Sequence, residues 1–293
     1  MKSFHVFAKG RSGWGIFYQR EDCLVYLTLF SVLARRFGLS VIAFNLMFNH
    51  THALVTGVDK ETIVAFQSRL ACIFAIQYNK HYRRSGPLFH HSFGCSCKTS
   101  TKSTMGSVAY VFNNPVAGRL CRTAKDGRWS LLAYRDSPCP FSGKIRRDRC
   151  RKILRRALQT VDMLHRHGKP LNYSVVQRLF EPLEPEEKEQ LTDYIINKYN
   201  FLDYAELERL YGNFGKVLTA IDANAGSEYD LEDEYGDHTC YRKMIAFAKK
   251  RIRLERICSE NLTAAEIQWL VNDLHAQTGA KQSNIAKFLH LER

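Results

Sequence analysis

The chain has 293 residues, a net charge of +14 and a hydrophobic share of 45%, the composition of a globular protein with one large core or two ordinary ones. No segment approaches the roughly 18 uninterrupted apolar residues of a membrane span, and the first residues lack the apolar core of a signal peptide. We therefore expect a cytoplasmic protein without a membrane partner. Nine cysteines at irregular spacing argue against a disulfide framework and favour reduced thiols.

The positive charge is concentrated in the first half of the chain. Residues 1–158 carry 26 Lys and Arg against 7 Asp and Glu, a net charge of +19, whereas residues 159–293 carry 17 against 22, a net charge of −5. Such a basic field is typical of nucleic-acid binding, because neutralising phosphates releases counterions; a solvated face or a membrane-surface patch would carry the same charge. The first half is therefore the candidate polyanion binder.

The first predicted elements are a strand, a helix and a hairpin. Residues 4–8 alternate weakly and predict a strand, and residues 21–37 carry apolar side chains at helical spacing. Residues 39–47 and 50–56 are rich in strand formers, and the break between them at Phe48-Asn49 predicts an antiparallel hairpin.

A second helix, a strand and a third helix follow. Residues 59–82 have a long helical pattern, residues 88–97 predict a short strand after a Ser85-Gly86-Pro87 turn, and residues 101–112 predict a helix. The order β-α-β-β-α-β-α predicts an α+β fold, a ferredoxin-like antiparallel sheet with helices on one face.

Beyond residue 140 the sequence predicts helices alone. We place a domain boundary there, after Ser137-Pro138-Cys139-Pro140, with residues 1–140 as the first domain and residues 141–293 as an all-α accessory region. A dense basic helix is expected over Lys144–Arg156. Further helical periods are expected at residues 151–167, 184–199, 203–210 and 263–277.

The C-terminal segment Gln282–Leu289 is typical of the first helix of a helix-turn-helix. The chain stops soon after this segment. We interpret the end either as a truncated DNA-binding element or as an accidental similarity.

Two histidines lie on the second strand of the predicted hairpin. Strand residues two apart point to the same face, so the imidazoles of His50 and His52 could bind one metal ion. His165 and His167 have the same spacing on a predicted helix, where positions two apart diverge by about 200°. The second pair therefore favours a surface or packing role.

Tyr110 and Asn114 are four residues apart at the end of a predicted helix, hence on one face. One could be a nucleophile and the other a metal ligand. A divalent ion held by two imidazoles and an amide oxygen keeps positions open for phosphate oxygens, and a tyrosine hydroxyl can attack phosphorus to form a phosphotyrosine. The alternative is that Tyr110 is one of 14 packed tyrosines and that Asn114-Pro115 only ends the helix.

Several blocks of sequence carry a family resemblance over about the first 135 residues. They are Lys9-Gly10, Phe37-Gly38-Leu39, the run from Asn45 to Val55, the run from Tyr82 to Phe89, the run from Tyr110 to Gly118, and Trp129-Ser130. In order and spacing these blocks resemble the REP-associated tyrosine transposases, which are single-tyrosine HUH transposases, and their insertion-sequence relatives. The chain departs from the pattern at Thr51, where relatives have a bulky apolar residue, and at Phe48, where a proline is common.

The resemblance implies a metal-dependent strand transferase for single-stranded DNA. His50, His52 and Asn114 would bind Mg²⁺ or Mn²⁺, and Tyr110 would attack a phosphodiester to leave a 5′-phosphotyrosine link and a free 3′-hydroxyl. The implied partner is single-stranded DNA with hairpin structure, and both a monomer and a homodimer remain open.

A cluster of basic and aromatic residues is the predicted DNA contact. We expect Tyr82, Arg83, Arg84 and Lys98 to stack on bases or neutralise phosphates. The alternative for the first three is the solvated last turn of a helix, where cations complement the helix dipole. Two rival functions are a domesticated DNA-binding protein without catalysis and a metal-dependent RNA-processing enzyme on the same fold.

Overall fold

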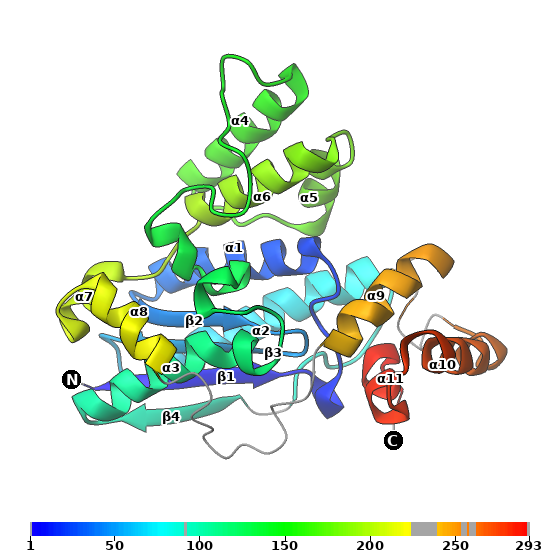
Figure 1. Cartoon of the computed structure of the whole chain (residues 1–293), viewed down its shortest axis with the longest axis horizontal. Helices are drawn as coiled ribbons and strands as arrows, with labels where there is room; N and C mark the ends of the chain where they lie inside the picture. The colour runs from blue at the N-terminus through cyan, green and yellow to red at the C-terminus, as the bar shows by residue number, and fades with distance from the viewer. Residues whose placement is uncertain (1, 91–92, 224–238, 253–256, 258–261, 292–293) are drawn as a thin grey trace.

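The computed structural model describes residues 2–90, 93–223, 239–252, 257 and 262–291. Within these residues the strands form one antiparallel sheet with the order β2-β3-β1-β4, the order of a ferredoxin-like sandwich (Figure 1). The strands are β1 (Ser3–Lys9), β2 (Ser40–Leu46), β3 (His50–Thr56) and β4 (Gly94–Lys98). The α+β fold predicted from the sequence is confirmed.

Helices cover both faces of the sheet. Helices α1 (Arg20–Arg36) and α2 (Lys60–Tyr82) pack against each other on one face, where the Tyr26 hydroxyl lies 3.2 Å from Thr51 Oγ1 of β3. Helix α3 (Thr101–Ala117) covers the other face, where Thr104 Oγ1 lies 2.8 Å from Ser3 Oγ of β1.

The prediction of helices on one face was therefore wrong for α3. Residues directly opposite in an antiparallel pair share a face, and Thr51 is opposite Ala8, whereas Ser3 lies an odd number of positions away on the same strand. All seven residues of β3 are buried, because each face of this strand has its own helical layer.

The remaining elements follow α3. Short 3₁₀ turns are η1 (Arg11–Gly13), η2 (Ala124–Asp126), η3 (Arg128–Ser130) and η4 (Leu132–Arg135). The later helices are α4 (Lys152–Arg166), α5 (Tyr173–Phe180), α6 (Pro185–Lys198), α7 (Tyr204–Tyr211), α8 (Phe214–Ala223), α9 (Thr239–Arg251), α10 (Ala264–Thr278) and α11 (Gln282–Leu289).

Two corrections concern the bounds of predicted elements. The basic helix expected over residues 144–156 begins only at Lys152. Residues 144–151 form turns and coil, in which the backbone N–H groups of Arg149 and Cys150 donate to the Arg146 carbonyl oxygen, and the non-helical backbone of Arg151 (ψ 146°) separates this turn from α4. The strand expected over residues 88–97 is β4, residues 94–98, with Phe89 making an isolated bridge to Gly10. None of the described helices is long and apolar enough to cross a membrane.

The C-terminal helices pack directly onto the sheet domain. Helices α4 to α6 lie beyond α1 (Figure 1), and the Tyr173 hydroxyl of α5 donates to the buried carboxylate of Asp22 in α1 at 2.7 Å. Helix α8 packs against α3, and Asn113 Nδ2 of α3 donates to the Ile221 carbonyl oxygen of α8 at 2.7 Å. Buried side chains therefore form one continuous core across residue 140.

Helix α11 lies against the loop that follows β1. The Tyr18 hydroxyl donates to the Phe288 carbonyl oxygen at 2.6 Å, and the His290 ring stacks on Trp14 with 4.7 Å between centroids. The predicted helix at residues 282–289 is present, preceded by α10 and a left-handed turn at Gly279. A DNA-binding role for it stays a prediction.

Candidate active site

The face of the sheet beneath α3 holds the histidine pair. His50 and His52 are each 1% exposed, and their ring centroids are 4.9 Å apart with an interplanar angle of 81°. Strand alternation puts both side chains on this face, as the two-residue spacing predicted. The cross-strand neighbours of the pair on β1 are Lys9 and Phe7.

Both histidines make hydrogen bonds through Nδ1. His52 Nδ1 lies 3.0 Å from Nε2 of His5, and His50 Nδ1 lies 2.8 Å from Oδ1 of Asn49. A metal-binding histidine characteristically uses its second ring nitrogen to bond a neighbouring group, which fixes the tautomer and the ring orientation. With Nδ1 engaged in this way, Nε2 is the atom of each ring that suits a metal.

The environment of His52 favours its neutral form. Burial lowers the pKa of His52 well below its usual value, and the charges of His50, His5 and Lys9 lower it further. The neutral imidazole is the form that can donate a lone pair to a metal.

Helix α3 brings Tyr110 to the same place. The Tyr110 ring is edge-on to His52 and to His5, with 5.5 Å between centroids in each case. Because Thr104 meets Ser3 and Tyr110 meets His5, α3 runs along β1 toward the end that carries Lys9 and, opposite it, His50. The structure thus places the predicted nucleophile beside the predicted metal ligands.

Asn114 lies one helical turn beyond Tyr110. The side chain is 3% exposed, and its Nδ2 donates to the Tyr110 carbonyl oxygen at 3.1 Å. This hydrogen bond uses the amide nitrogen and leaves the amide oxygen as the atom that could bind a metal. Two imidazoles and one amide oxygen are a donor set that a divalent ion accepts. Among the described residues no group of three or more His, Cys, Asp or Glu side chains is placed to hold a metal.

The four predicted DNA contacts divide into two kinds. Tyr82 is fully buried and its hydroxyl donates to Asp22 Oδ2 at 2.9 Å, so the ring has no open face for a nucleobase. Arg84 is 7% exposed and donates to Asn79 Oδ1 at 2.6 Å. Arg83, the left-handed residue after α2, is exposed, and Lys98 is half-buried on the edge strand β4. Only these last two are placed to meet a phosphate.

Sequence reasoning missed His5 and Asn45. His5 lies at the second odd position of β1, and Asn45 is opposite His52 in the β2–β3 pairing, so both share the face of the histidine pair. Each is a polar residue whose two neighbours in the strand are apolar. That contrast was the available signal, but it does not say which of the two faces the site.

Part of the basic charge of the first half is used inside the fold. Arg128 forms ion pairs with Glu189 and Asp193 of α6. Further pairs join residues of the basic half to the acidic half: Arg20 with Glu189, Arg135 with Glu208, Arg147 with Asp162, and Arg151 with Glu184 and Glu187. Some of the basic residues in the first half therefore hold the acidic C-terminal helices in place and do not contribute to binding a polyanion.

No protein-family model and no curated protein matches the sequence. Among solved structures, a REP-associated tyrosine transposase bound to a REP hairpin aligns with 49% of this chain and 87% of its own, at 15% identity and a TM-score of 0.37.

Proposed function

We propose that the chain is a metal-dependent enzyme that nicks single-stranded DNA and transfers the strand through a phosphotyrosine. The observation that carries the proposal is the contact of the Tyr110 ring with the His52 ring on one buried face of the sheet. The ring centroids of His52 and His50 are 4.9 Å apart on the same face. A tyrosine on a metal-ligand cluster is a specific arrangement, because its hydroxyl is poor as a nucleophile unless the target phosphate is held beside it.

His50, His52 and Asn114 would hold Mg²⁺ or Mn²⁺. When bound, the ion would polarise a phosphate oxygen and neutralise part of the charge that develops on the phosphorus group. His5 and Asn49 would keep the two imidazoles in the orientation and tautomer that the site needs.

Tyr110 would carry the covalent step. Its hydroxyl oxygen bonds to phosphorus while the bond from phosphorus to the 3′ oxygen breaks, and the phenol proton leaves as the 3′ oxygen becomes a hydroxyl. The products are a 5′-phosphotyrosine and a free 3′-hydroxyl. Attack by a 3′-hydroxyl of another strand reverses the step and restores Tyr110, so the number of phosphodiester bonds is conserved and no nucleotide cofactor is needed.

The substrate in this proposal is single-stranded DNA next to a hairpin. The experiment is to incubate the full chain with Mn²⁺ and end-labelled hairpin oligonucleotides of DNA or of RNA and to resolve the products under denaturing conditions. A labelled adduct with DNA that needs Mn²⁺ is the expected result. Cleavage of RNA without an adduct would favour an RNA-processing enzyme, and binding of DNA without either product would favour a DNA-binding protein that no longer transfers strands.

A further inference from the structure

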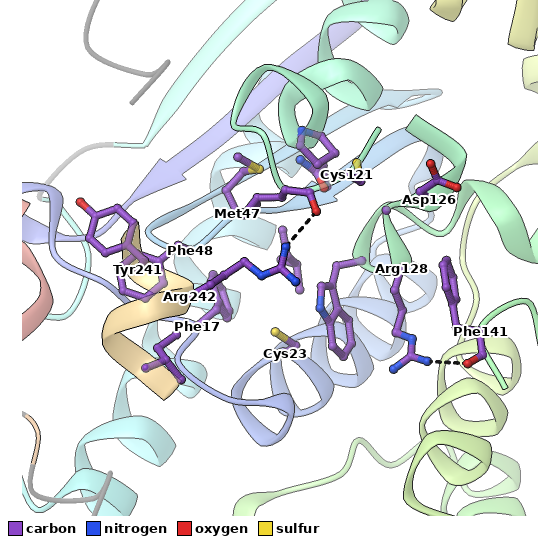
Figure 2. A pocket seen from close by; sticks show the side chains of 17 residues that line it. Phe17, Cys23, Met47, Phe48, Cys121, Asp126, Arg128, Phe141, Tyr241 and Arg242 are labelled. Atoms are coloured by element: carbon purple, nitrogen blue, oxygen red, sulfur yellow. Dashed lines mark hydrogen bonds between the residues drawn. The ribbon is translucent and has the colours of Figure 1, made fainter. Parts of the chain in front are cut away.

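A cavity of about 430 Å³ opens beside the candidate active site. Its walls come from the end of β2, the chain after α3 and helix α9, as Figure 2 shows. Asn45 and Pro115 are both in its lining, and these residues are respectively the cross-strand neighbour of His52 and the chain neighbour of Asn114. The cavity therefore shares a wall with the proposed catalytic face.

Asn45 places an unsatisfied donor in that wall. The side chain is 1% exposed, and its Nδ2 has no hydrogen-bond partner among the described residues. A buried donor that makes no hydrogen bond costs free energy, and in a native structure such a donor calls for a partner such as an ordered water or a ligand. The donor at Asn45 would suit a carbonyl oxygen or a ring nitrogen.

Aromatic side chains form other walls of the cavity. Phe48 and Tyr241 of α9 stack with 4.0 Å between centroids and an interplanar angle of 15°, and Trp129 also lines the cavity. Flat apolar walls around a donor are the features by which proteins hold an extruded base, through stacking and an edge hydrogen bond.

A positively charged side chain in the cavity is available to pair with a phosphate. Arg242 of α9 is exposed, extends into the cavity in Figure 2 and donates to the Leu120 carbonyl oxygen at 3.3 Å, with no carboxylate partner in the described part of the chain. The other charged lining residues are engaged: Arg128 by Glu189 and Asp193, and Asp126 by the backbone N–H of Thr123 at 3.0 Å.

We propose that this cavity binds one unpaired nucleobase of single-stranded DNA, with Asn45 Nδ2 donating to the edge of the base and Arg242 pairing with its phosphate. The proposal rests on the proposed function, because the shared wall would put the bound nucleotide next to the phosphodiester that Tyr110 attacks. A volume of about 430 Å³ lies within the usual range of ligand pockets, about 300–1,000 Å³. Because α9 supplies Tyr241 and Arg242, this site depends on the helical region beyond the sheet domain.

The test measures binding without chemistry, so that its outcome does not depend on strand transfer. Full-length protein carrying Tyr110→Phe, without metal, is titrated against labelled 20-mers of each deoxynucleotide and against a 20-mer of abasic deoxyribose phosphates with the same charge. Base-bearing DNA should bind about tenfold more tightly than abasic DNA, the scale of one stacked base. Asn45→Leu should reduce this ratio about fivefold or more while leaving the affinity for the abasic strand unchanged.

Arg242→Ala should weaken binding of both strands. The slope of log affinity against log salt concentration should become shallower by about one, as expected for the loss of one phosphate contact. The matched control is Lys243→Ala, the adjacent exposed residue of α9 that does not line the cavity, which should leave the ratio of base-bearing to abasic affinity unchanged. Asn45→Leu should also raise the melting temperature of the unbound protein, because it replaces an unsatisfied buried donor by an apolar group of similar size.

Three results would overturn the proposal. The first is equal binding of base-bearing and abasic strands by the parent protein. The second is an unchanged ratio, or a lower melting temperature, in Asn45→Leu, which would give Asn45 a structural role. The third is displacement of a fluorescent nucleotide by deoxynucleoside monophosphates but not by base-bearing 20-mers, which would identify a site for free nucleotides. Failure of adduct formation by the unmodified protein would contradict only the proposed function.

Discussion

The Nε2 atom of His5 lies 3.0 Å from the Nδ1 atom of His52, across the pairing of β1 with β3. If His52 binds a metal through Nε2, its Nδ1 carries the proton, so His5 accepts this hydrogen bond and holds its own proton on Nδ1. The bond fixes both tautomers. It also stacks the two rings with 5.1 Å between their centroids.

Replacing His5 should therefore weaken metal binding. We expect His5→Ala to reduce the affinity for Mn²⁺ about 10-fold to 100-fold, the usual effect of losing a partner of a metal-binding histidine. His5→Gln offers a carbonyl oxygen as acceptor and should recover part of the loss. Isothermal titration calorimetry, or the electron paramagnetic resonance signal of free Mn²⁺, measures the affinity. An unchanged affinity in His5→Ala would show that His5 does not support the metal site.

The histidine pair itself is tested by single replacements. His50→Ala and His52→Ala should each abolish Mn²⁺-dependent cleavage, because each removes one of three proposed ligands. The control is His167→Ala, from a pair with the same spacing at the C-terminal end of α4, where His167 caps the helix and its Nδ1 bonds the Met163 carbonyl oxygen at 2.7 Å. Cleavage at the parent rate in either active-site variant would show that the ion is held elsewhere.

Arg83 and Arg84 are neighbours with different predicted effects. Arg83 is exposed, so Arg83→Ala should weaken binding of single-stranded DNA and lower the salt dependence by about one phosphate without changing stability. Arg84 is buried and bonded to Asn79, so Arg84→Ala should cost about 2 kcal/mol of stability. Fluorescence anisotropy and urea unfolding of both variants make the comparison; a purely destabilising effect of Arg83→Ala would contradict a DNA contact there.

The docking of the C-terminal segment should depend on pH through His290. Burial lowers the pKa of His290 to about 3, with a smaller lowering from Arg84, while its Nε2 bonds the Gly15 carbonyl oxygen at 2.7 Å. In the unfolded chain the pKa returns to about 6.5, so the unfolded state binds more protons below that pH. The stability that His290 contributes is full above pH 6.5 and is lost as the pH falls toward 3.

At pH 5 the loss is about 2 kcal/mol, from 1.36 kcal/mol for each pH unit below 6.5. Urea unfolding of the parent protein and of His290→Gln at pH 7.5 and pH 5 isolates the effect as the difference between their pH dependences. Identical pH dependence in the two proteins would show that His290 titrates normally in the folded chain.

The sequence was sufficient where periodicity and spacing decide the structure. The alternation of β3 put His50 and His52 on one face, and the i,i+4 spacing put Tyr110 and Asn114 on one side of α3. The sequence did not predict which polar and aromatic side chains would be buried. Tyr82 and Arg84 occur in a basic, aromatic run that is typical of a DNA-binding surface, yet both are inside because α5 and the η1 loop pack over the end of α2.

Long-range pairing explains the rest of what the sequence did not reveal. His5 carries no motif, and its role follows only from the register of β1 against β3, which brings residues 47 positions apart within 3.0 Å. The same holds for the face on which α3 packs. Neither spacing nor composition near residue 110 distinguishes the two faces of a sheet that is buried on both sides.

The most direct measurement is the identity of the tyrosine in a trapped adduct. Tyr110→Phe removes only a hydroxyl, so the variant should fold, bind Mn²⁺ and bind single-stranded DNA as the parent does, yet form no covalent adduct. Peptide mapping of the parent adduct should give a DNA-linked peptide that contains Tyr110. A linked peptide containing another tyrosine, such as Tyr78 or Tyr82, or an adduct that persists in Tyr110→Phe, would contradict the proposed mechanism.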